Sequence, residues 1–372
     1  MNKLKGLIPI AYFCCVISYA QSNWTIIHEM SPGKLFTGVA ASGNQIVVVG
    51  SNGLIFTLVD GLERKQVNSV TTNSLTSITW GGNLFVAVGE RGTIISSSEG
   101  LWWYAEISGT TIPFKSVCWS GKEFIAVGGS VNGYIFSSEN GRNWTEIYSR
   151  IGSPQNGVSG DSNKMVSVGD QGSLLTRVGN GGWSVGSIGG SDLYAVSNSE
   201  SVYVAVGNNG ALYSSANGSA PRSLAASSLT GITRGTREFV AVGDAGLPNR
   251  GVIHSSIDGI TWSARSLSIP HRLIDITWTG SQYVAVGADM SIFTSKDDAS
   301  ITINFQSRIE KRRLPKNPFF DLENFVDGKF EIDLNASGSF YDIKGSKISI
   351  SRGTLIDIHR GNSQVLIVRK NQ

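Results

Sequence analysis

Residues 77–103 read SITWGGNLFVAVGERGTIISSSEGLWW, and variants of this stretch recur seven times along the 372-residue chain. Each copy contains a run similar to V-A-V-G, and the glycine that ends this run aligns the copies. The seven anchor glycines are Gly50, Gly89, Gly128, Gly169, Gly207, Gly243 and Gly287. The steps between them are 39, 39, 41, 38, 36 and 44 residues. This spacing is typical of repeats that each form one small β-sheet, as in propellers.

The residues around each anchor glycine predict β-strands. Val precedes the glycine in every copy, and Val or Ile stands three residues before it. Apolar β-branched residues at every second position suit a strand that is packed between two sheets. Another Val or Ile, eleven residues before the glycine, marks an earlier strand, and a third strand follows a short glycine turn. We therefore expect each repeat to be a four-stranded blade with strands a, b, c and d in chain order.

The turn after strand c carries a further motif. Strand c leads to a Ser or Thr in all seven copies, and in several copies the turn ends in Gly followed by Trp. Two examples are SSENGRNW at 137–144 and SSIDGITW at 255–262. The pattern resembles the Asp-box or BNR repeat, S-x-D-x-G-x-x-W, of sialidases, xyloglucanase-like enzymes and photosystem II assembly-factor propellers. Here Glu139 occupies the Asp position of the motif in the third copy, and Ile257 occupies it in the sixth, where Asp258 is displaced by one. The resemblance implies a propeller fold over residues 24 to about 298, and no particular activity.

The repeats predict an all-β protein, with a seven-bladed β-propeller over residues 21–300. Residues 23–27 (NWTII) resemble residues 143–147 (NWTEI), which begin a strand d, while the seventh repeat has no Gly and Trp after its strand c. We therefore expect the N-terminal strand to complete the seventh blade. This closure would protect sheet edges that otherwise recruit other chains. The alternative is that residues 301–306 complete that blade.

The two ends of the chain differ from the repeats. Residues 1–20 have the features of a signal peptide, because Lys3 and Lys5 precede a short apolar run that ends in Ser-Tyr-Ala. Residues 301–316 form a basic linker. Residues 317–372 contain short alternating segments separated by glycines, which predicts a small C-terminal β-sandwich. No membrane span is expected after removal of the signal, because the apolar run is short.

The C-terminal segment also shows a family resemblance. The stretches PKNPFFD (315–321) and SFYDIKGSKI (339–348), with a terminal strand ending in Arg369 and Lys370, resemble the sorting domain of type IX secretion cargo. The family has Pro-Asn-Pro where Lys316 intervenes in this chain. The resemblance implies a secreted or cell-surface protein of a Gram-negative bacterium, with the secretion machinery as a partner.

Composition excludes several classes of function. Cys118 is the only cysteine after residue 20, so the exported chain would form no internal disulfide. The formal net charge is +3, yet residues 21–305 contain 17 basic and 20 acidic side chains. A slightly acidic propeller predicts no nucleic-acid partner. The four histidines have no spacing suited to metal ligands, so we expect no metal and no cofactor.

The b–c loops carry the candidate ligand-binding residues. They follow the anchor glycines and lie, with the d–a loops, on one face of the predicted ring. Several have the pattern Gly-acid-x-Gly, in which a carboxylate often caps backbone N–H groups. Loops on a rigid scaffold are also where binding residues concentrate. The candidates are Glu90, Arg91, Asp170, Asn208, Asp244, Arg250 and Asp289.

These observations predict an exported, non-enzymatic binding or scaffold protein that recognises a glycan or a protein through the b–c and d–a face. The alternative is a carbohydrate-active glycoside hydrolase, which needs two carboxyl groups about 5–10 Å apart. No catalytic residue is assigned, because the sialidase arginine motif is matched only by the Arg-Ile pair at 150–151. A deep pocket with two facing carboxyl groups favours the hydrolase, and a rim whose polar groups are satisfied within the turns favours the binding protein.

Overall fold

In a computed structural model of the protein, the described residues are 24–28, 33–43, 45–59, 63–199, 202–216, 222–224, 228–247 and 250–296, with short strands at 14–19, 301–306, 330–332, 339–341, 347–348 and 367–369. The chain divides into two units. One spans Ser22–Asp297, and the other combines Met1–Gln21 with Asp298–Gln372. The repeats all lie in the first unit.

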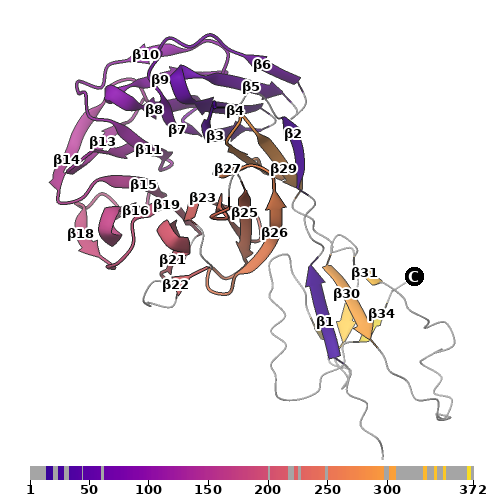
Figure 1. The fold of residues 1–372 in the computed structure, drawn as a ribbon. Coiled ribbons are helices and arrows are strands. Elements are labelled where there is room, and N and C mark those ends of the chain that lie inside the picture. The colour runs from indigo at the N-terminus through magenta and orange to yellow at the C-terminus, as the bar shows by residue number, and fades with distance from the viewer. Residues whose placement is uncertain are drawn as a thin grey trace, which may run out of the picture. The chain divides into compact units, whose positions relative to one another are not determined.

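The described part of Ser22–Asp297 forms seven four-stranded antiparallel sheets, one for each repeat (Figure 1). The first four blades are β3–β6 (Phe36–Ser42, Gln45–Gly50, Ile55–Val59, Glu63–Gln66), β7–β10 (Leu75–Gly81, Leu84–Gly89, Ile94–Ser97, Tyr104–Glu106), β11–β14 (Phe114–Trp119, Phe124–Gly128, Gly133–Ser138, Thr145–Ile151) and β15–β18 (Gln155–Gly160, Lys164–Gly169, Ser173–Val178, Ser184–Ser187). The fifth and sixth are β19–β22 (Leu193–Asn198, Tyr203–Gly207, Ala211–Ser214, Arg222–Ser223) and β23–β26 (Ser228–Arg234, Phe239–Asp244, Gly251–Ser256, Ser263–Ile269). The seventh contains β27–β29 (Leu273–Trp278, Gln282–Gly287, Ile292–Lys296).

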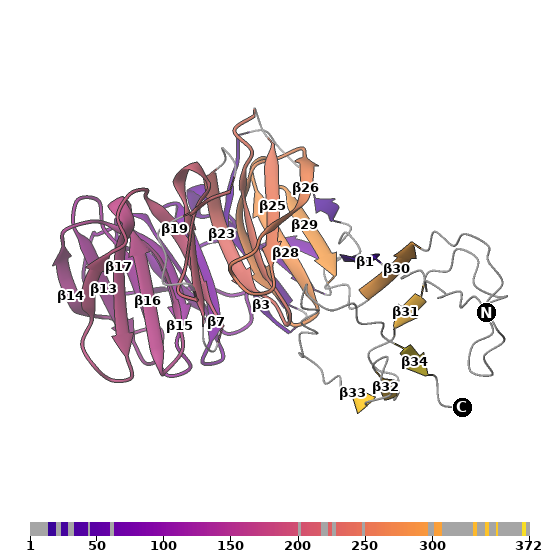
Figure 2. The ribbon, with the colours of Figure 1, turned by 90° about the horizontal axis from the view of Figure 1, so that it is seen from below.

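The blades form a closed ring around a central axis. The innermost strand of each blade, strand a, contacts strand a of the next blade, and β27 of the seventh blade contacts β3 of the first. Figure 2, turned by 90°, shows strands of successive blades, such as β16, β19, β23 and β28, following one another. Among the described residues the only helical elements are four three-residue 3-10 turns. The predicted all-β, seven-bladed propeller is therefore confirmed.

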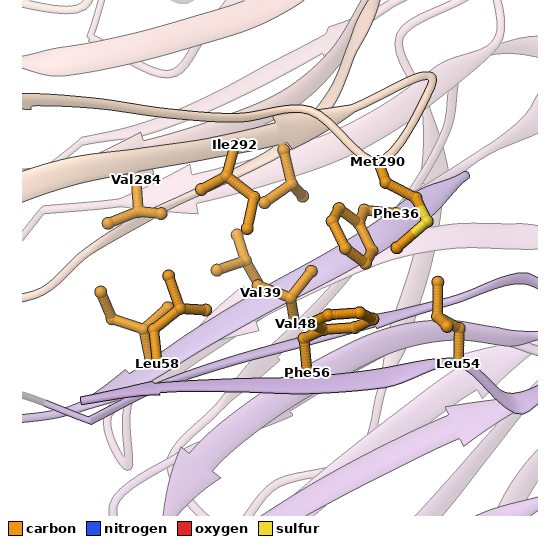
Figure 3. Close-up of a cluster of buried hydrophobic side chains, with 11 residues drawn as sticks. Phe36, Val39, Val48, Leu54, Phe56, Leu58, Val284, Met290 and Ile292 are labelled. Atoms are coloured by element: carbon orange, nitrogen blue, oxygen red, sulfur yellow. The ribbon is translucent and has the colours of Figure 1, made fainter. Parts of the chain in front are cut away.

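The seventh blade takes its outer strand from the other end of the repeat array. Strand β2 (Thr25–His28) pairs antiparallel with β29, and Trp24 lies near the ring of Tyr283, with 6.4 Å between centroids. The seam between the seventh and first blades is apolar. Figure 3 shows Val284, Met290 and Ile292 of the seventh blade facing a set from the first blade: Phe36, Val39, Val48, Leu54, Phe56 and Leu58. Hydrogen bonding and burial together close the ring at this seam.

The second unit contains two three-stranded sheets. Strand β30 (Ile301–Gln306) lies in the segment predicted as linker, and it pairs with β1 (Cys14–Tyr19), inside the predicted signal peptide, and with β31 (Phe330–Ile332). Residues 301–306 therefore form a strand, which agrees with their alternating Ile301, Ile303 and Phe305. They do not complete the seventh blade. Strand β32 (Ser339–Tyr341) pairs with β33 (Lys347–Ile348) and β34 (Ile367–Arg369), and the rest of the predicted sandwich lies outside the described residues.

Close backbone approach explains why the anchor position is always glycine. A Cβ atom at Gly89 would lie 2.1 Å from the carbonyl oxygen of Ser74, just before strand a of the same blade. A Cβ atom at any of the other six anchor glycines would lie 2.0–2.1 Å from the equivalent carbonyl oxygen. The backbone at Gly89 is extended, with φ near −170°, so the requirement comes from space rather than from the dihedral angle.

In the turn between strands c and d, the residue that accepts the backbone hydrogen bonds differs from the one that the motif indicates. In the third blade the side chain of Asn140 accepts hydrogen bonds from the backbone N–H groups of Arg142 (3.0 Å) and Asn143 (2.9 Å). In the sixth blade Asp258 accepts from Ile260 (2.8 Å) and Thr261 (2.7 Å). The residue that caps the turn therefore follows Glu139 and Ile257 by one position. Burial acts to raise the pKa of Asp258, but the hydrogen bonds from Thr261, Ile260 and Ser256 together lower it.

Candidate functional site

Among the described residues, a backbone hydrogen bond fixes the b–c loop to the residue just before strand a in six of the blades. In the second blade, Glu90 N–H donates to Ser74 O (3.0 Å), and the fourth blade repeats this bond between Asp170 N–H and Pro154 O (3.1 Å). In five blades the residue two positions after the anchor glycine adopts a left-handed conformation, as in Arg91 with φ of 55°. The loops therefore present their side chains from fixed backbone positions on the face where strands b end and strands a begin.

The seven candidate residues predicted from sequence are distributed over five blades. Glu90 and Arg91 are exposed in the second blade. In the fourth blade Asp170 Oδ1 accepts a hydrogen bond from Asn156 Nδ2 (2.7 Å), and in the fifth Asn208 Oδ1 accepts from Asn209 N–H (2.9 Å). In the sixth blade Asp244 Oδ1 caps Gly246 N–H (2.8 Å), and Arg250 is exposed. Several candidates therefore serve the turn chemistry that the sequence pattern indicated.

Asp289, in the seventh blade, has a partner that the sequence did not indicate. Its Oδ2 lies 3.2 Å from Nδ1 of His271, a buried residue of the preceding d–a loop. Its Oδ1 accepts a hydrogen bond from Gly33 N–H (3.3 Å), just before the first blade. The side chain of Asp289 therefore links the seventh blade to the segment that leads into the first blade, at the seam where the ring closes.

A β-bulge near the start of strand a positions a second group of side chains, one in each blade. The strand a–b register shifts at one residue in every blade, thirteen positions before the anchor glycine. Three of these bulge residues are Thr37, Thr76 and Thr230, and their hydroxyl groups donate to the carbonyl of the next blade's strand a, at Leu75, Phe114 and Leu273. At these three junctions the bulge residue thus links neighbouring blades. Bulges elsewhere often re-aim a side chain beside a functional site.

Blades three to five have Lys115, Asn156 and Tyr194 at this position. Asn156 hydrogen-bonds the loop carboxylate of Asp170, and the charges of Asp192 and Asp170 act on Tyr194. Lys115 Nζ donates to Asn156 Oδ1 (2.6 Å). Asn156 Nδ2 donates both to Asp170 Oδ1 (2.7 Å) and to Leu193 O of the fifth blade (2.9 Å). Asp192 Oδ1 accepts from Gln171 N–H (2.9 Å) in the fourth b–c loop. We call Lys115, Asn156, Asp170, Asp192 and Tyr194 the blade 3–5 cluster.

The electrostatics of the cluster centre on Tyr194. Burial, and then the negative charges of Asp192 and Asp170, raise the pKa of its phenol, so Tyr194 is a hydroxyl donor at neutral pH. Lys115 offers further N–H donors, and each carboxylate has a second oxygen that can accept. The cluster is therefore able to pair with both donors and acceptors of a polar ligand. Its residues do not include the three His, Cys, Asp or Glu ligands that would hold a metal, nor do other described residues form such a group.

Of the cluster, only Asp170 was predicted from the sequence, and the other four members were not. Lys115, Asn156 and Tyr194 share one alignment column, in which three other repeats have Thr. That departure was the available signal. It was not interpretable without the structure, because the contacts from Lys115 to Asn156 and from Asn156 to Leu193 cross between blades, about 40 residues apart in sequence.

Comparisons with known proteins agree with this architecture. No family model and no curated protein matches the chain. Among solved structures, "YCF48 bound to D1 peptide" has a TM-score of 0.59 at 15% identity, covering 76% of this chain and 97% of that one. "YCF48 from Cyanidioschyzon merolae" has a TM-score of 0.57 at 15% identity, with coverage of 74% and 99%. The WD40 propeller domain of Doa1 has 0.58 at 13%, with coverage of 75% and 98%. At such identities the likeness shows the propeller fold alone.

Within the described residues, none of the helical elements is long and apolar enough to cross a bilayer.

Proposed function

We propose that the protein is a non-enzymatic binding module that takes an extended polypeptide segment of a partner on the face formed by its b–c and d–a loops. The observation that carries this proposal is the blade 3–5 cluster, where Lys115, Asn156 and Tyr194 stand at the position of the Thr that links blades at three other junctions. At those junctions Thr is sufficient for the link. The replacement adds an amide and a phenol near two carboxylates, and a lysine that donates to the amide.

A polypeptide suits this mixture of groups. An extended segment presents N–H donors and C=O acceptors along its whole length, and the cluster offers both kinds of partner. The loops are fixed by backbone hydrogen bonds to strand a, so that little ordering of the protein is needed on binding. YCF48, a protein of similar fold, has a structure bound to a D1 peptide, and this supports the same kind of ligand for the present propeller.

A glycoside hydrolase is the second candidate, because the charges of Asp170 and Asp192 both raise the pKa of the Tyr194 phenol, which places two carboxyl groups near one side chain. Two nearby carboxyl groups are the machinery that hydrolysis needs. However, Asp170 accepts from the Asn156 amide and Asp192 from a backbone N–H of the neighbouring loop. Such hydrogen bonds fix the carboxylates as acceptors within the loops, which favours binding over acid catalysis.

Selection of random dodecapeptides displayed on phage against the full chain tests the proposal. We expect a set of peptides whose synthetic forms bind with a measurable Kd, and we expect Asp170→Ala to weaken them about tenfold, the loss of one hydrogen bond to a charged group. The control is Trp102→Ala, which alters a 71% exposed side chain in the turn between β9 and β10 of the second blade, at the opposite end of the strands from the b–c loops. Peptides that bind both variants equally would contradict the assignment of this face.

A glycan array read for both binding and cleavage separates the remaining possibilities. Retention of a glycan without any peptide binder would overturn the polypeptide proposal in favour of a lectin. Cleavage that is abolished by Asp170→Asn would favour the hydrolase.

Export belongs to the same proposal. Its support is the apolar segment after Lys3 and Lys5 and the resemblance of residues 315–372 to a sorting domain. We expect the mature chain to begin at Gln21 in a native host, and N-terminal sequencing of protein from the culture medium and from cells checks this. A chain that keeps Met1 and stays inside the cell would contradict export.

A further inference from the structure

Resting on the proposed function, we propose that Asn156 is the positioning residue of the binding face, holding the Asp170 carboxylate and the Lys115 ammonium in one fixed arrangement. Asn156 joins three blades through one amide group. Its oxygen accepts from Lys115 Nζ of the third blade, and its nitrogen donates to Asp170 Oδ1 and to Leu193 O of the fifth.

At the bulge position of strand a, the other blades show the link between blades without the additional bonds that Asn156 makes. Thr37, Thr76 and Thr230 make the same bond to the next blade's carbonyl with one hydroxyl group. Thr is therefore sufficient for the link between blades. Asn156 adds the bonds to Lys115 and Asp170, which a hydroxyl group on a shorter side chain does not replace. The additional bonds contribute to the arrangement of charge on the face rather than to the closure of the ring.

The local packing supports a fixed Asn156. The preceding residue, Gln155, is fully buried in a column where the other blades have Phe or Leu. Gln155 Nε2 donates to Ser173 Oγ (2.9 Å), and its Oε1 accepts from Ser167 Oγ (2.8 Å). The bulge residue is thus attached to a buried and hydrogen-bonded neighbour. A side chain held by such a network can orient charged groups without paying for their ordering when a partner binds.

The variant Asn156→Thr distinguishes the two roles, because it restores the residue that other blades use. With the peptides selected against the full-length wild type, we expect binding to weaken at least tenfold while the melting temperature stays close to that of the wild type. Thr230→Val is the matched control, since it removes the bond to Leu273 O between the sixth and seventh blades. That variant should lower the melting temperature and leave peptide affinity unchanged.

A double-mutant cycle distinguishes a positioning role from a general effect on structure, because it measures the coupling between Asn156 and Asp170 in peptide binding. If Asn156 acts through Asp170 and Lys115, then Asn156→Thr together with Asp170→Asn weakens binding by less than the product of the two single losses. Unchanged affinity of Asn156→Thr, or losses that multiply in the double variant, would overturn the inference while the proposed function stands. If no peptide binds the wild type, the proposed function fails, and this inference fails with it.

Discussion

The carboxylate of Asp275 accepts a hydrogen bond from the backbone N–H of Val39 at 3.0 Å, joining the innermost strand of the seventh blade to that of the first. At two other blade junctions the equivalent acceptor is a neutral hydroxyl: Ser77 accepts from Val117 N–H (3.3 Å), and Ser116 accepts from Val158 N–H (3.3 Å). The closing seam therefore has a titratable group where those junctions have a serine.

The charge of Asp275 makes the stability of the ring depend on pH. Burial raises its pKa from 3.8 to about 6, against the opposing effect of the N–H groups of Val39 and Ile276. Between these two pKa values the folded state binds a proton that the unfolded state has lost. Stability from this group is thus fully present below pH 3.8 and is lost as the pH rises through about 6.

The variant Asp275→Asn tests this effect. Its amide oxygen can still accept from Val39, and no charge remains to be desolvated. Because the side chain keeps partial contact with solvent, we expect a gain of about 1–2 kcal/mol at pH 7.5, less than the full pKa shift implies. Thermal unfolding between pH 4.5 and 8 checks it, with Ser116→Ala as a control whose pH dependence should match that of the wild type. A variant as pH-dependent as the wild type would contradict the role of Asp275.

Strand β2 should contribute more to propeller stability than the whole C-terminal segment. A chain that begins at residue 31 loses the pairing of β2 with β29 and the packing of Trp24, and exposes the edge of the seventh blade. Compared with a chain that begins at residue 21, we expect the melting temperature to fall by about 10 °C, which corresponds to a few kcal/mol. Deletion of residues 307–372 is the control and should change it little. Equal melting temperatures for the two N-terminal forms would refute closure by β2.

The buried polar group of the fourth blade should behave as a unit. Gln155→Leu alone leaves the hydroxyl groups of Ser167 and Ser173 without their partner, at a cost of about 1–3 kcal/mol. The triple variant with Ser167→Ala and Ser173→Ala should recover most of this loss, since five other blades have Ala at the position of Ser167. Chemical denaturation of the wild type and both variants measures the difference. A triple variant less stable than Gln155→Leu would show that the hydroxyl groups have other partners.

The repeats predicted the fold because their causes are local and recur. The Val columns, the anchor glycines and the NWTII segment at residues 23–27 each reflect packing or pairing that is repeated from blade to blade, so one sequence contains several copies of the signal. The blade 3–5 cluster occurs once. Its contacts depend on a bulge that redirects Asn156 and on the spacing between blades, and neither is visible in residue types alone.

The c–d turn allows a last prediction, because motif and structure name different residues there. The motif places the important side chain at Glu139, whereas Asn140 accepts the N–H groups of Arg142 and Asn143. Asn140→Ala should therefore destabilise the third blade by about 0.5–1 kcal/mol, as the loss of a comparable cap does. Glu139→Ala should stay within about 0.5 kcal/mol of the wild type, as expected for an exposed residue. Urea denaturation of both variants measures these losses of stability. A larger loss for Glu139→Ala would favour the motif's assignment and would contradict the capping role of Asn140.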